Sequence, residues 1–355
     1  MKLKLLLPLA IGLVLLHMGA SAQDGDIIKL GFDARADWVH ESLNGDKVDP
    51  NSGFKGKYFN IRLDGHISSK FDFSYRQRLN RPNKSDSFFD ATDWLWLRYQ
   101  PTNNWAISAG KQVVLIGGWE YDRSPIDLYF CSEFWNNISC YQWGASVTYT
   151  SDKGNNSLTF QACQSPFDTP DNDLYAYNLM WNVKSGCYTG IHTLNASEFA
   201  NGNYIYYVAL GNRFNWGDAA LEVDYMERIS SGNSLFDNFS VMGEFSYLIA
   251  KRVNIFAKAT YDKCSYGYTS GKDFTIYPGT EITRLGGGVE YYPLGGRGDR
   301  SVRIHAVYSY TIGNNTNPAG TALDEQSIFT IGATWKVDIL KIAKKLFGRN
   351  GKSQQ

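Results

Sequence analysis

Apolar and polar residues alternate along most of this chain, in about sixteen short segments between Ile28 and Val337. In the first segment, one face carries Ile28, Leu30, Phe32, Ala34, Ala36 and Trp38. In the last segment, the same rhythm groups Phe329, Ile331, Ala333, Trp335 and Val337. A period of two belongs to a β-strand, because successive side chains of a strand point to opposite faces. The chain is therefore predicted to be all-β.

The segments are joined by connections that alternate between long and short. Long connections are expected at residues 39–57, 80–91, 114–140, 165–173, 195–203, 229–238, 262–281 and 311–327. The short ones are rich in Gly, Asn, Asp and Pro, which suit tight turns, and include 100–104, 151–156, 184–186, 215–218 and 250–252. This pattern predicts a transmembrane antiparallel up-and-down β-barrel of about 16 strands, with elaborate loops at one end. One missed or added hairpin would make the count about 14 or 18.

The composition agrees with strands that face lipid on one side and water on the other. Aromatic residues make up 15% of the chain. Those at strand ends include Trp38, Phe59, Tyr99, Trp105, Tyr149, Tyr291, Tyr310 and Trp335. Transmembrane barrels gather Trp and Tyr in girdles at the two interfaces, although soluble β-sandwiches also use aromatic residues. Mean hydropathy is only -0.34, and beyond the N-terminus no segment reaches the ~18 apolar residues of a membrane helix.

The N-terminus has the pattern of an export signal. Lys2 and Lys4 precede an apolar stretch over residues 5–19, and Ala20, Ser21 and Ala22 form a small-residue cleavage site. We therefore predict a cleaved secretory signal peptide at residues 1–22, a barrel over 23–337 and a location in the outer membrane of a Gram-negative cell. Removal of Lys2 and Lys4 leaves 33 of the 35 basic residues against 35 acidic ones. This balance gives no support for nucleic-acid binding through bulk charge.

One segment resembles a known family. The run from Ala109 to Gln112, followed by residues 117–127 (GGWEYDRSPID), is similar to porins of the phosphate-selective O/P family, particularly those of the Bacteroidetes. The resemblance implies a sixteen-stranded, usually trimeric outer-membrane porin with basic residues in its lumen. The arginine and lysine ladders that bind phosphate in the best-known members have no position-by-position counterpart in this sequence.

The longest connection, residues 114–140, lies between the fifth and sixth predicted strands. In sixteen-stranded porins the corresponding loop commonly folds into the barrel and narrows it. Its mixture of aromatic and charged residues suits such a constriction, with Trp119, Glu120, Asp122, Arg123 and Glu133 as candidate constriction residues. The alternative is a surface loop that caps the barrel. Cys131 and Cys140 either form a disulfide that closes this loop, since export favours oxidation, or remain free thiols.

The sequence offers little for catalysis or for a metal. His66, His192 and His305 lie in no hydrolase motif, and the chain has no serine elbow and no His-Glu-x-x-His. The five cysteines show no metal-binding spacing. The triplet Gly286 to Gly288 lies inside an alternating strand with no following helix, which favours a close-packed or bent wall over a phosphate loop. We expect no enzyme activity, no cofactor and no metal.

The C-terminal strand, residues 330–337, is similar to the signal that the outer-membrane assembly machinery reads. The chain then continues as a basic tail over 338–355, in which Ile339, Ile342 and Leu346 alternate with lysines in the manner of a short amphipathic helix. This helix is expected either to lie on the inner leaflet or to plug the periplasmic mouth. A frayed tail without a function is the third alternative.

Charges on the predicted inner face are unevenly distributed. The candidate pore-lining basic residues are Lys29, Arg35, Arg62, Arg76, Arg78, Arg98, Lys258, Arg284, Arg303 and Lys336. The inward acids beside them are Asp33, Asp37, Asp64, Asp72 and Glu290. An excess of positive charge on the wall of a water-filled pore favours anions. The alternative is that the arginines pair with the acids and brace the wall.

These observations predict an outer-membrane porin for passive diffusion of small polar solutes, with a weak preference for anions that the resemblance extends to phosphate. The alternative is a plugged structural or surface-binding barrel that is accessory to nutrient or glycan uptake. Expected partners are outer-membrane lipid, small anionic or polar solutes, the assembly machinery and two further copies in a homotrimer. Nucleic acid is not among them.

Overall fold

The computed structural model describes residues 28–80, 88–167, 173–230, 234–265, 275–295, 301–318 and 325–347. The predicted signal peptide and the end of the C-terminal tail lie outside these residues. The strands are β1 (Ile28–Leu43), β2 (Asp46–Lys47), β3 (Gly53–Ser68), β4 (Phe71–Arg78), β5 (Thr92–Tyr99), β6 (Trp105–Val113), β7 (Tyr141–Thr150), β8 (Asn156–Gln164) and β9 (Tyr175–Ser185). They continue as β10 (Tyr188–Ala200), β11 (Asn203–Trp216), β12 (Ala219–Ile229), β13 (Asn238–Ile249), β14 (Val253–Cys264), β15 (Glu281–Tyr291), β16 (Val302–Asn314) and β17 (Glu325–Asp338).

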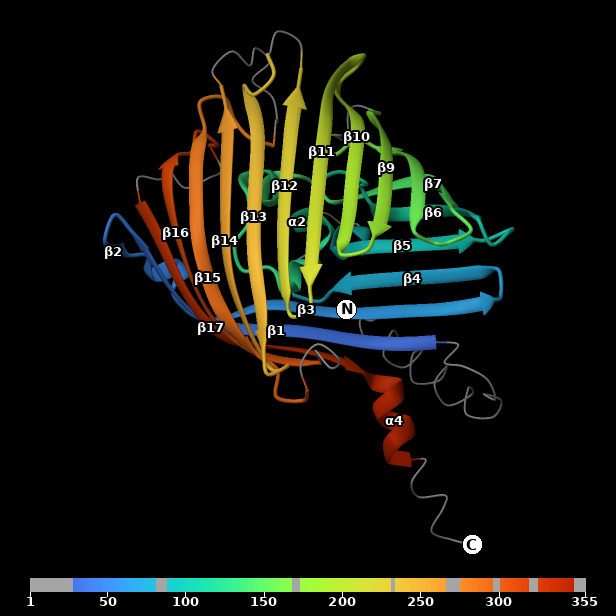
Figure 1. Ribbon diagram of the computed structural model, residues 1–355, viewed down its shortest axis with the longest axis horizontal. Coiled ribbons are helices and arrows are strands. Elements are labelled where there is room, and N and C mark those ends of the chain that lie inside the picture. The colour runs from blue at the N-terminus through green and yellow to red at the C-terminus, as the bar shows by residue number, and fades with distance from the viewer. Residues whose placement is uncertain are drawn as a thin grey trace, which may run out of the picture.

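The long strands form a closed antiparallel barrel (Figure 1). Each pairs with its neighbours in sequence, and β1 closes the sheet by pairing with both β3 and β17. Ala34 of β1, for example, lies opposite Phe59 on one side and Trp335 on the other. The two-residue β2 only extends the first hairpin, so the barrel has 16 strands. The predicted fold class is confirmed.

Burial in this barrel is the reverse of that in a soluble protein. On β16, Ile304 and Tyr308 are 46% and 49% exposed on the outer face, whereas Arg303 and His305 are 7% and 1% exposed on the inner face. The other long strands repeat this arrangement, with large apolar side chains outside and polar ones inside. Because the sheet is closed, the backbone N–H and C=O groups of the strands hydrogen-bond to one another, which they could not do with lipid. The outer face is therefore suited to a bilayer.

The connections differ from the sequence expectation at one end of the barrel. The long connection expected at 195–203 is a tight turn at Asn201–Gly202, because β10 continues to Ala200 and β11 begins at Asn203. Gly202 adopts a φ of +72°, a conformation that glycine reaches without steric cost, and the carboxylate of Glu198 accepts a hydrogen bond from its backbone nitrogen (3.0 Å). The loop expected at 39–57 is also shorter, since β1 and β3 extend beyond the predicted ends.

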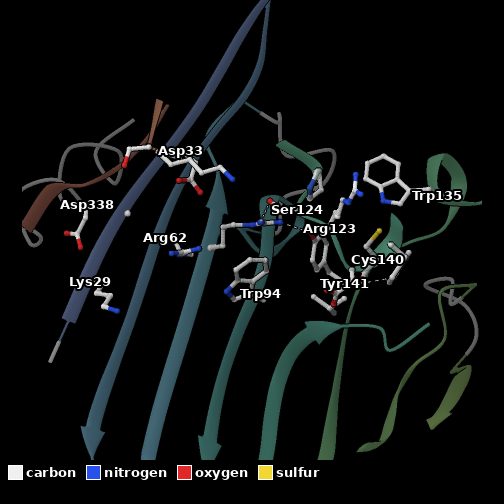
Figure 2. Close-up of a pocket in the computed structure, with 18 of the residues that line it drawn as sticks. Lys29, Asp33, Arg62, Trp94, Arg123, Ser124, Trp135, Cys140, Tyr141 and Asp338 are labelled. Atoms are coloured by element: carbon white, nitrogen blue, oxygen red, sulfur yellow. Dashed lines mark hydrogen bonds between the residues drawn. The ribbon is translucent and has the colours of Figure 1, made fainter. Parts of the chain in front are cut away.

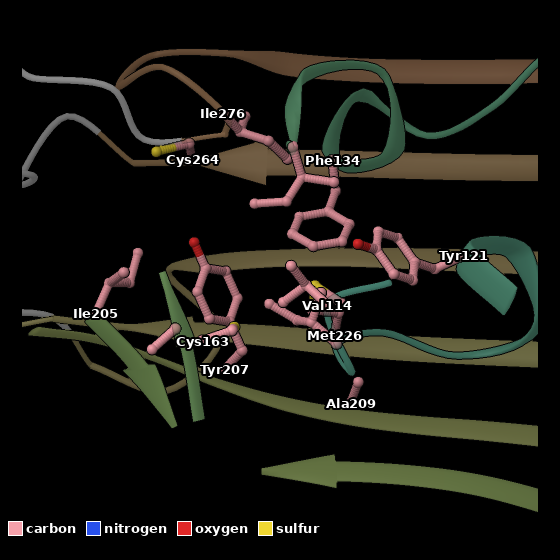
Figure 3. Close-up of a cluster of buried hydrophobic side chains, with 13 residues drawn as sticks. Val114, Tyr121, Phe134, Cys163, Ile205, Tyr207, Ala209, Met226, Cys264 and Ile276 are labelled. Carbon is pink, nitrogen blue, oxygen red and sulfur yellow. The ribbon is translucent and has the colours of Figure 1, made fainter. Parts of the chain in front are cut away.

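The segment between β6 and β7, residues 114–140, is named the lumen loop below. It contains the short helices α2 (Trp119–Asp122) and α3 (Glu133–Asn137) and a 3-10 turn at Pro125–Asp127. Val114, Tyr121 and Phe134 of this loop belong to a buried cluster that includes Tyr207 of β11 and Met226 of β12 (Figure 3). This buried apolar cluster thus joins the lumen loop to the inside of the wall.

The C-terminal helix α4 (Ile339–Phe347) begins directly after β17. The Asp338 carboxylate accepts a hydrogen bond from the backbone nitrogen of Lys341 (3.0 Å), which satisfies one of the free N–H groups at the helix start. Figure 1 shows α4 below the barrel, at the end that carries the short turns. Among the described helices, none is long and apolar enough to span a membrane.

Candidate functional site

The lumen loop crosses the inside of the barrel. Its backbone nitrogens at Leu115, Glu120 and Glu133 donate hydrogen bonds to wall side chains on β8, β12 and β14, at 2.9, 2.7 and 2.8 Å. On the opposite side, Arg35 of β1 donates to the carbonyl oxygen of Leu128 (2.5 Å). Since these strands lie on different sides of the barrel, the loop occupies its interior rather than capping its rim.

Two carboxylates of the lumen loop pair with buried basic residues of the wall. Glu120 Oε1 lies 2.6 Å from Lys258 Nζ of β14, and Glu133 Oε2 lies 2.5 Å from Arg284 Nη2 of β15. Both pairs are almost fully removed from solvent. A buried carboxylate or ammonium is stable only when it is paired, because its desolvation costs several kcal/mol. These contacts therefore hold the loop in one position.

Asp127 makes a third link between the loop and the wall. Its carboxylate lies 2.6 Å from Lys336 Nζ of β17 and 3.1 Å from Arg303 Nη1 of β16. This side chain is about one third exposed, with a relative area of 31%. The link is therefore weaker than the buried pairs.

Arg123 makes the reverse arrangement, with the cation on the loop and the acids on the wall. Its guanidinium pairs with Glu222 of β12 and with Glu244 of β13, the latter at 2.8 Å. Burial alone would lower the pKa of Arg123, but Glu244 and Glu222 raise it above its usual value. Arg123 is therefore charged at every physiological pH.

Two wall glycines make room for the lumen loop. A Cβ on Gly211 of β11 would lie 2.8 Å from Cα of Gly118, and one on Gly286 of β15 would lie 2.7 Å from ring carbons of Phe130. Both distances are shorter than carbon atoms tolerate. The glycine triplet that begins at Gly286 therefore provides a close-packed wall, on which Phe130 rests.

A cavity of about 830 Å³ lies at the end with the short turns (Figure 2). The candidate basic residues Lys29, Arg62, Arg76 and Lys336 line it. Lys341 of α4 also lies on its wall. We name it the turn-end cavity. A neighbouring cavity of about 250 Å³ shares Lys336 with it and adds the candidates Lys258 and Arg303.

Two further cavities lie at the end with the long loops. Arg35 lines one of about 440 Å³, and Arg284 lines the other, of about 290 Å³. The remaining two candidates line none of these four cavities. Arg78 pairs with Asp93 of β5 at 2.8 Å, and Arg98 of β5 lies opposite Asp72 of β4 in the sheet register.

The five candidate loop residues lie in three environments. Glu120, Arg123 and Glu133 are tied to the wall as described above. Asp122 faces the turn-end cavity. Trp119 lies beside Arg213 of β11, with the guanidinium carbon 5.4 Å from a ring centre.

Sequence reasoning missed several acids that neutralise the basic wall. Asp127 of the loop and the wall residues Asp93 and Asp262 are absent from the predicted set of inward acids, although all three pair with candidate basic residues. The strand pattern alone therefore overestimates the positive excess. The sequence contains one indication that Asp127 matters, because this residue ends the motif that carries the family resemblance. Nothing in the neighbouring sequence indicates which residues Asp127 pairs with.

The cysteine bridge considered for the lumen loop is not formed. All five cysteines are free thiols, and Cys131 is buried. Burial raises the pKa of the Cys131 thiol well above its usual value, so this side chain is unreactive.

A sixteen-stranded barrel with an apolar exterior, a charged lumen and an internal loop defines the class of outer-membrane porins. Comparison with protein families agrees: the family model described as phosphate-selective porin O and P matches residues 28–206. The chain belongs to this family. A search of the curated proteins finds no match.

Solved structures show the same fold. OmpT of Vibrio cholerae is 15% identical, with a TM-score of 0.59, and the match covers 89% of this chain and 100% of that one. An anion-selective porin from Comamonas acidovorans is 10% identical, with a TM-score of 0.59 and coverage of 87% and 99%. The channel DcaP of Acinetobacter baumannii is 12% identical, with a TM-score of 0.59 and coverage of 87% and 96%. Family and fold are both typical of channels without enzyme activity.

Proposed function

We propose that this porin lets small polar solutes diffuse passively across the outer membrane, with a weak preference for anions that include phosphate. The observation that carries the proposal is the charge of the turn-end cavity. Six basic side chains line it (Lys29, Arg62, Arg76, Arg123, Lys336 and Lys341), against three acidic ones (Asp33, Asp122 and Asp338). A cavity with low-dielectric walls and an excess of one sign raises the local concentration of ions of the opposite sign.

The preference is weak because most lumen cations have acidic partners, and these include Arg62, Arg76, Arg123 and Lys336 of the turn-end cavity. The neighbouring 250 Å³ cavity has five basic residues (Arg123, Arg213, Lys258, Arg303 and Lys336) and four acidic ones (Asp127, Glu222, Glu244 and Glu290). Screening over ~8 Å at physiological salt reduces the field further. The solved Comamonas acidovorans porin, which shares the fold, is described as anion-selective.

Lys29 and Arg62 are the best residues for a test of this preference. Arg76 is buried and bound to Asp93 (2.7 Å), so its replacement would leave a buried carboxylate unpaired. Arg62 pairs with Asp64 at 2.8 Å, but both side chains of that pair are partly exposed, at 45% and 33%, and Lys29 and Arg62 both line the turn-end cavity. We expect Lys29→Gln combined with Arg62→Gln to reduce anion preference, measured as reversal potential in a KCl gradient.

The matched control is Lys153→Gln. Lys153 is exposed in the turn between β7 and β8 and lines none of the cavities described above. The Lys153→Gln substitution should leave the reversal potential unchanged. An unchanged reversal potential in the double variant would contradict the assignment of selectivity to the turn-end cavity, and a cation-selective wild type would contradict the preference itself. Addition of inorganic phosphate should lower the chloride current if phosphate uses the same route.

We also propose that residues 1–22 are removed on export and that the barrel assembles as a homotrimer. The basic and apolar pattern of the N-terminus supports the first point. A solved structure of Vibrio cholerae OmpT is described as the trimer form, which supports the second. N-terminal sequencing of the membrane protein and the native mass of the detergent-extracted complex test the two points separately.

A further inference from the structure

Tyr129 of the lumen loop occupies the boundary between the two ends of the lumen. It lines the 250 Å³ cavity on the turn side and both the 440 Å³ and 290 Å³ cavities on the side of the long loops. Phe130 lines two of these three cavities. Among the residues that the structure describes, Tyr129 is the one common to the three cavities.

The Tyr129 side chain is held by residues from several strands. Its hydroxyl donates a hydrogen bond to Glu290 Oε1 of β15 (2.7 Å). The guanidinium carbons of Arg35 and Arg303 lie over the ring, 4.6 and 5.3 Å from its centre. The ring of Phe256 stacks on it at 5.6 Å between centres, with an angle of 13° between planes.

These contacts fix the ring against one side of the lumen, since β14, β15, β16, β17 and β1 are consecutive neighbours in the closed sheet. Arg35 comes from β1, Phe256 from β14 and Arg303 from β16, so cations and an aromatic ring reach Tyr129 from different strands. A cation over an aromatic face contributes about 0.5–2 kcal/mol. The ring is therefore anchored well enough to act as a fixed obstacle between the cavities.

We propose that Tyr129 is the permeability-determining residue of this porin, and that its ring limits the passage between the two ends of the lumen. This inference rests on the proposed diffusion of solutes through the lumen. The inference adds to that proposal the residue that sets the rate of solute diffusion and the largest solute that can pass. The two arginines beside the ring would be the cations that a small anion meets as it passes.

Tyr292 of the wall provides a matched control. Its hydroxyl donates to the other oxygen of the same carboxylate, Glu290 Oε2, at the same distance of 2.7 Å. Tyr292 lines the 250 Å³ cavity but neither cavity on the side of the long loops. Loss of its ring would enlarge one cavity without joining the two ends.

The test is single-channel conductance of the full-length protein in planar bilayers. Tyr129→Ala should raise conductance about twofold or more, since it removes the ring from the route, and Tyr129→Leu should raise it less. Tyr129→Phe keeps the ring and should retain wild-type conductance. Tyr292→Ala should also retain it. Heat-modifiable migration in gels verifies that each barrel is folded.

The proposal is overturned if folded Tyr129→Ala and Tyr129→Leu conduct no better than the wild type. It is also overturned if Tyr129→Phe or Tyr292→Ala raises conductance as much as Tyr129→Ala does. A silent wild type with a conducting Tyr129→Ala supports it. Reversal potential, which tests anion preference, is read separately, so a failure of the selectivity proposal is distinct from a failure at Tyr129.

Discussion

Lys258 of β14 lies 2.6 Å from Glu120 of the lumen loop, measured from Nζ to Oε1, and both side chains are buried. The ammonium also donates a hydrogen bond to the carbonyl oxygen of Phe130 (2.9 Å). Ser132 donates to the same carboxylate through its backbone nitrogen. One wall cation thus fixes two separate parts of the loop.

We expect Lys258→Met to destabilise the lumen loop by about 3–5 kcal/mol, because the Glu120 carboxylate would remain buried without its cation. The double variant Lys258→Met with Glu120→Gln should recover part of this loss. Limited trypsin digestion at Arg123 measures release of the loop, since that residue lies within it. Equal protection of the single variant and the wild type would contradict the role given to this ion pair.

Gly286→Val should displace Phe130 from the wall. The added side chain would meet the Phe130 ring and the carbonyl oxygen of Tyr308, and overpacking of this kind costs about 1–3 kcal/mol. Gly243→Val on β13 is the control, because a Cβ there has no atom within 4 Å among those described. Urea unfolding in detergent should show a lower midpoint for the first variant and a near-native midpoint for the second. The same midpoint for both would contradict the packing account.

Cys187 allows a test of topology. It is the exposed thiol in the turn between β9 and β10, at the end with the short turns, whereas Cys131, Cys163 and Cys264 are buried. If that end faces the periplasm, a membrane-impermeant maleimide should label Cys187 only after the cells are permeabilised. Cys187→Ser should abolish this rapid labelling. Rapid labelling on intact cells would show that the barrel has the opposite orientation, with the short turns outside.

Removal of residues 339–355 should leave the barrel assembled, because β17 pairs with β1 as far as Asp338. Lys341 and Ile342 of α4 line the turn-end cavity, so their loss should raise conductance and lower anion preference. Lys341→Gln removes the charge but keeps most of the side-chain volume. It should therefore lower anion preference and leave conductance unchanged. A truncated chain that fails to assemble would show instead that α4 is part of the folding unit.

Much of the fold could be predicted from the sequence because a membrane barrel repeats a local pattern. The period of two identified the strands, and the gap at 114–140 agrees with the end of β6 at Val113 and the start of β7 at Tyr141. The turn at Asn201–Gly202 was missed because small and polar residues continue the strand there without a strong apolar rhythm. Local pattern determines a strand, whereas the exact length of a hairpin depends on single turn residues.

The interior of the lumen was predicted less well, for a different reason. Periodicity places Arg303 and Lys336 on the inner face, but it does not show that Asp127 of a distant loop reaches both. The position of Tyr129 depends likewise on contacts with β1, β14, β15 and β16, all of which are far from Tyr129 in sequence. Such long-range pairings leave no local signal. A net charge of the lumen that is counted from the strands alone is therefore too positive, because it leaves out the carboxylates of the lumen loop.

The most direct test of the central claim is a recording of the purified wild-type protein in a planar bilayer under a KCl gradient. The account predicts steady open steps and a reversal potential that indicates a modest preference for chloride over potassium. Raising the salt concentration on both sides at a fixed ratio should weaken this preference, because screening shortens from ~8 Å to ~3 Å as salt approaches 1 M. A silent, correctly folded barrel would contradict the diffusion function, and a preference for potassium would contradict the role assigned to the basic turn-end cavity.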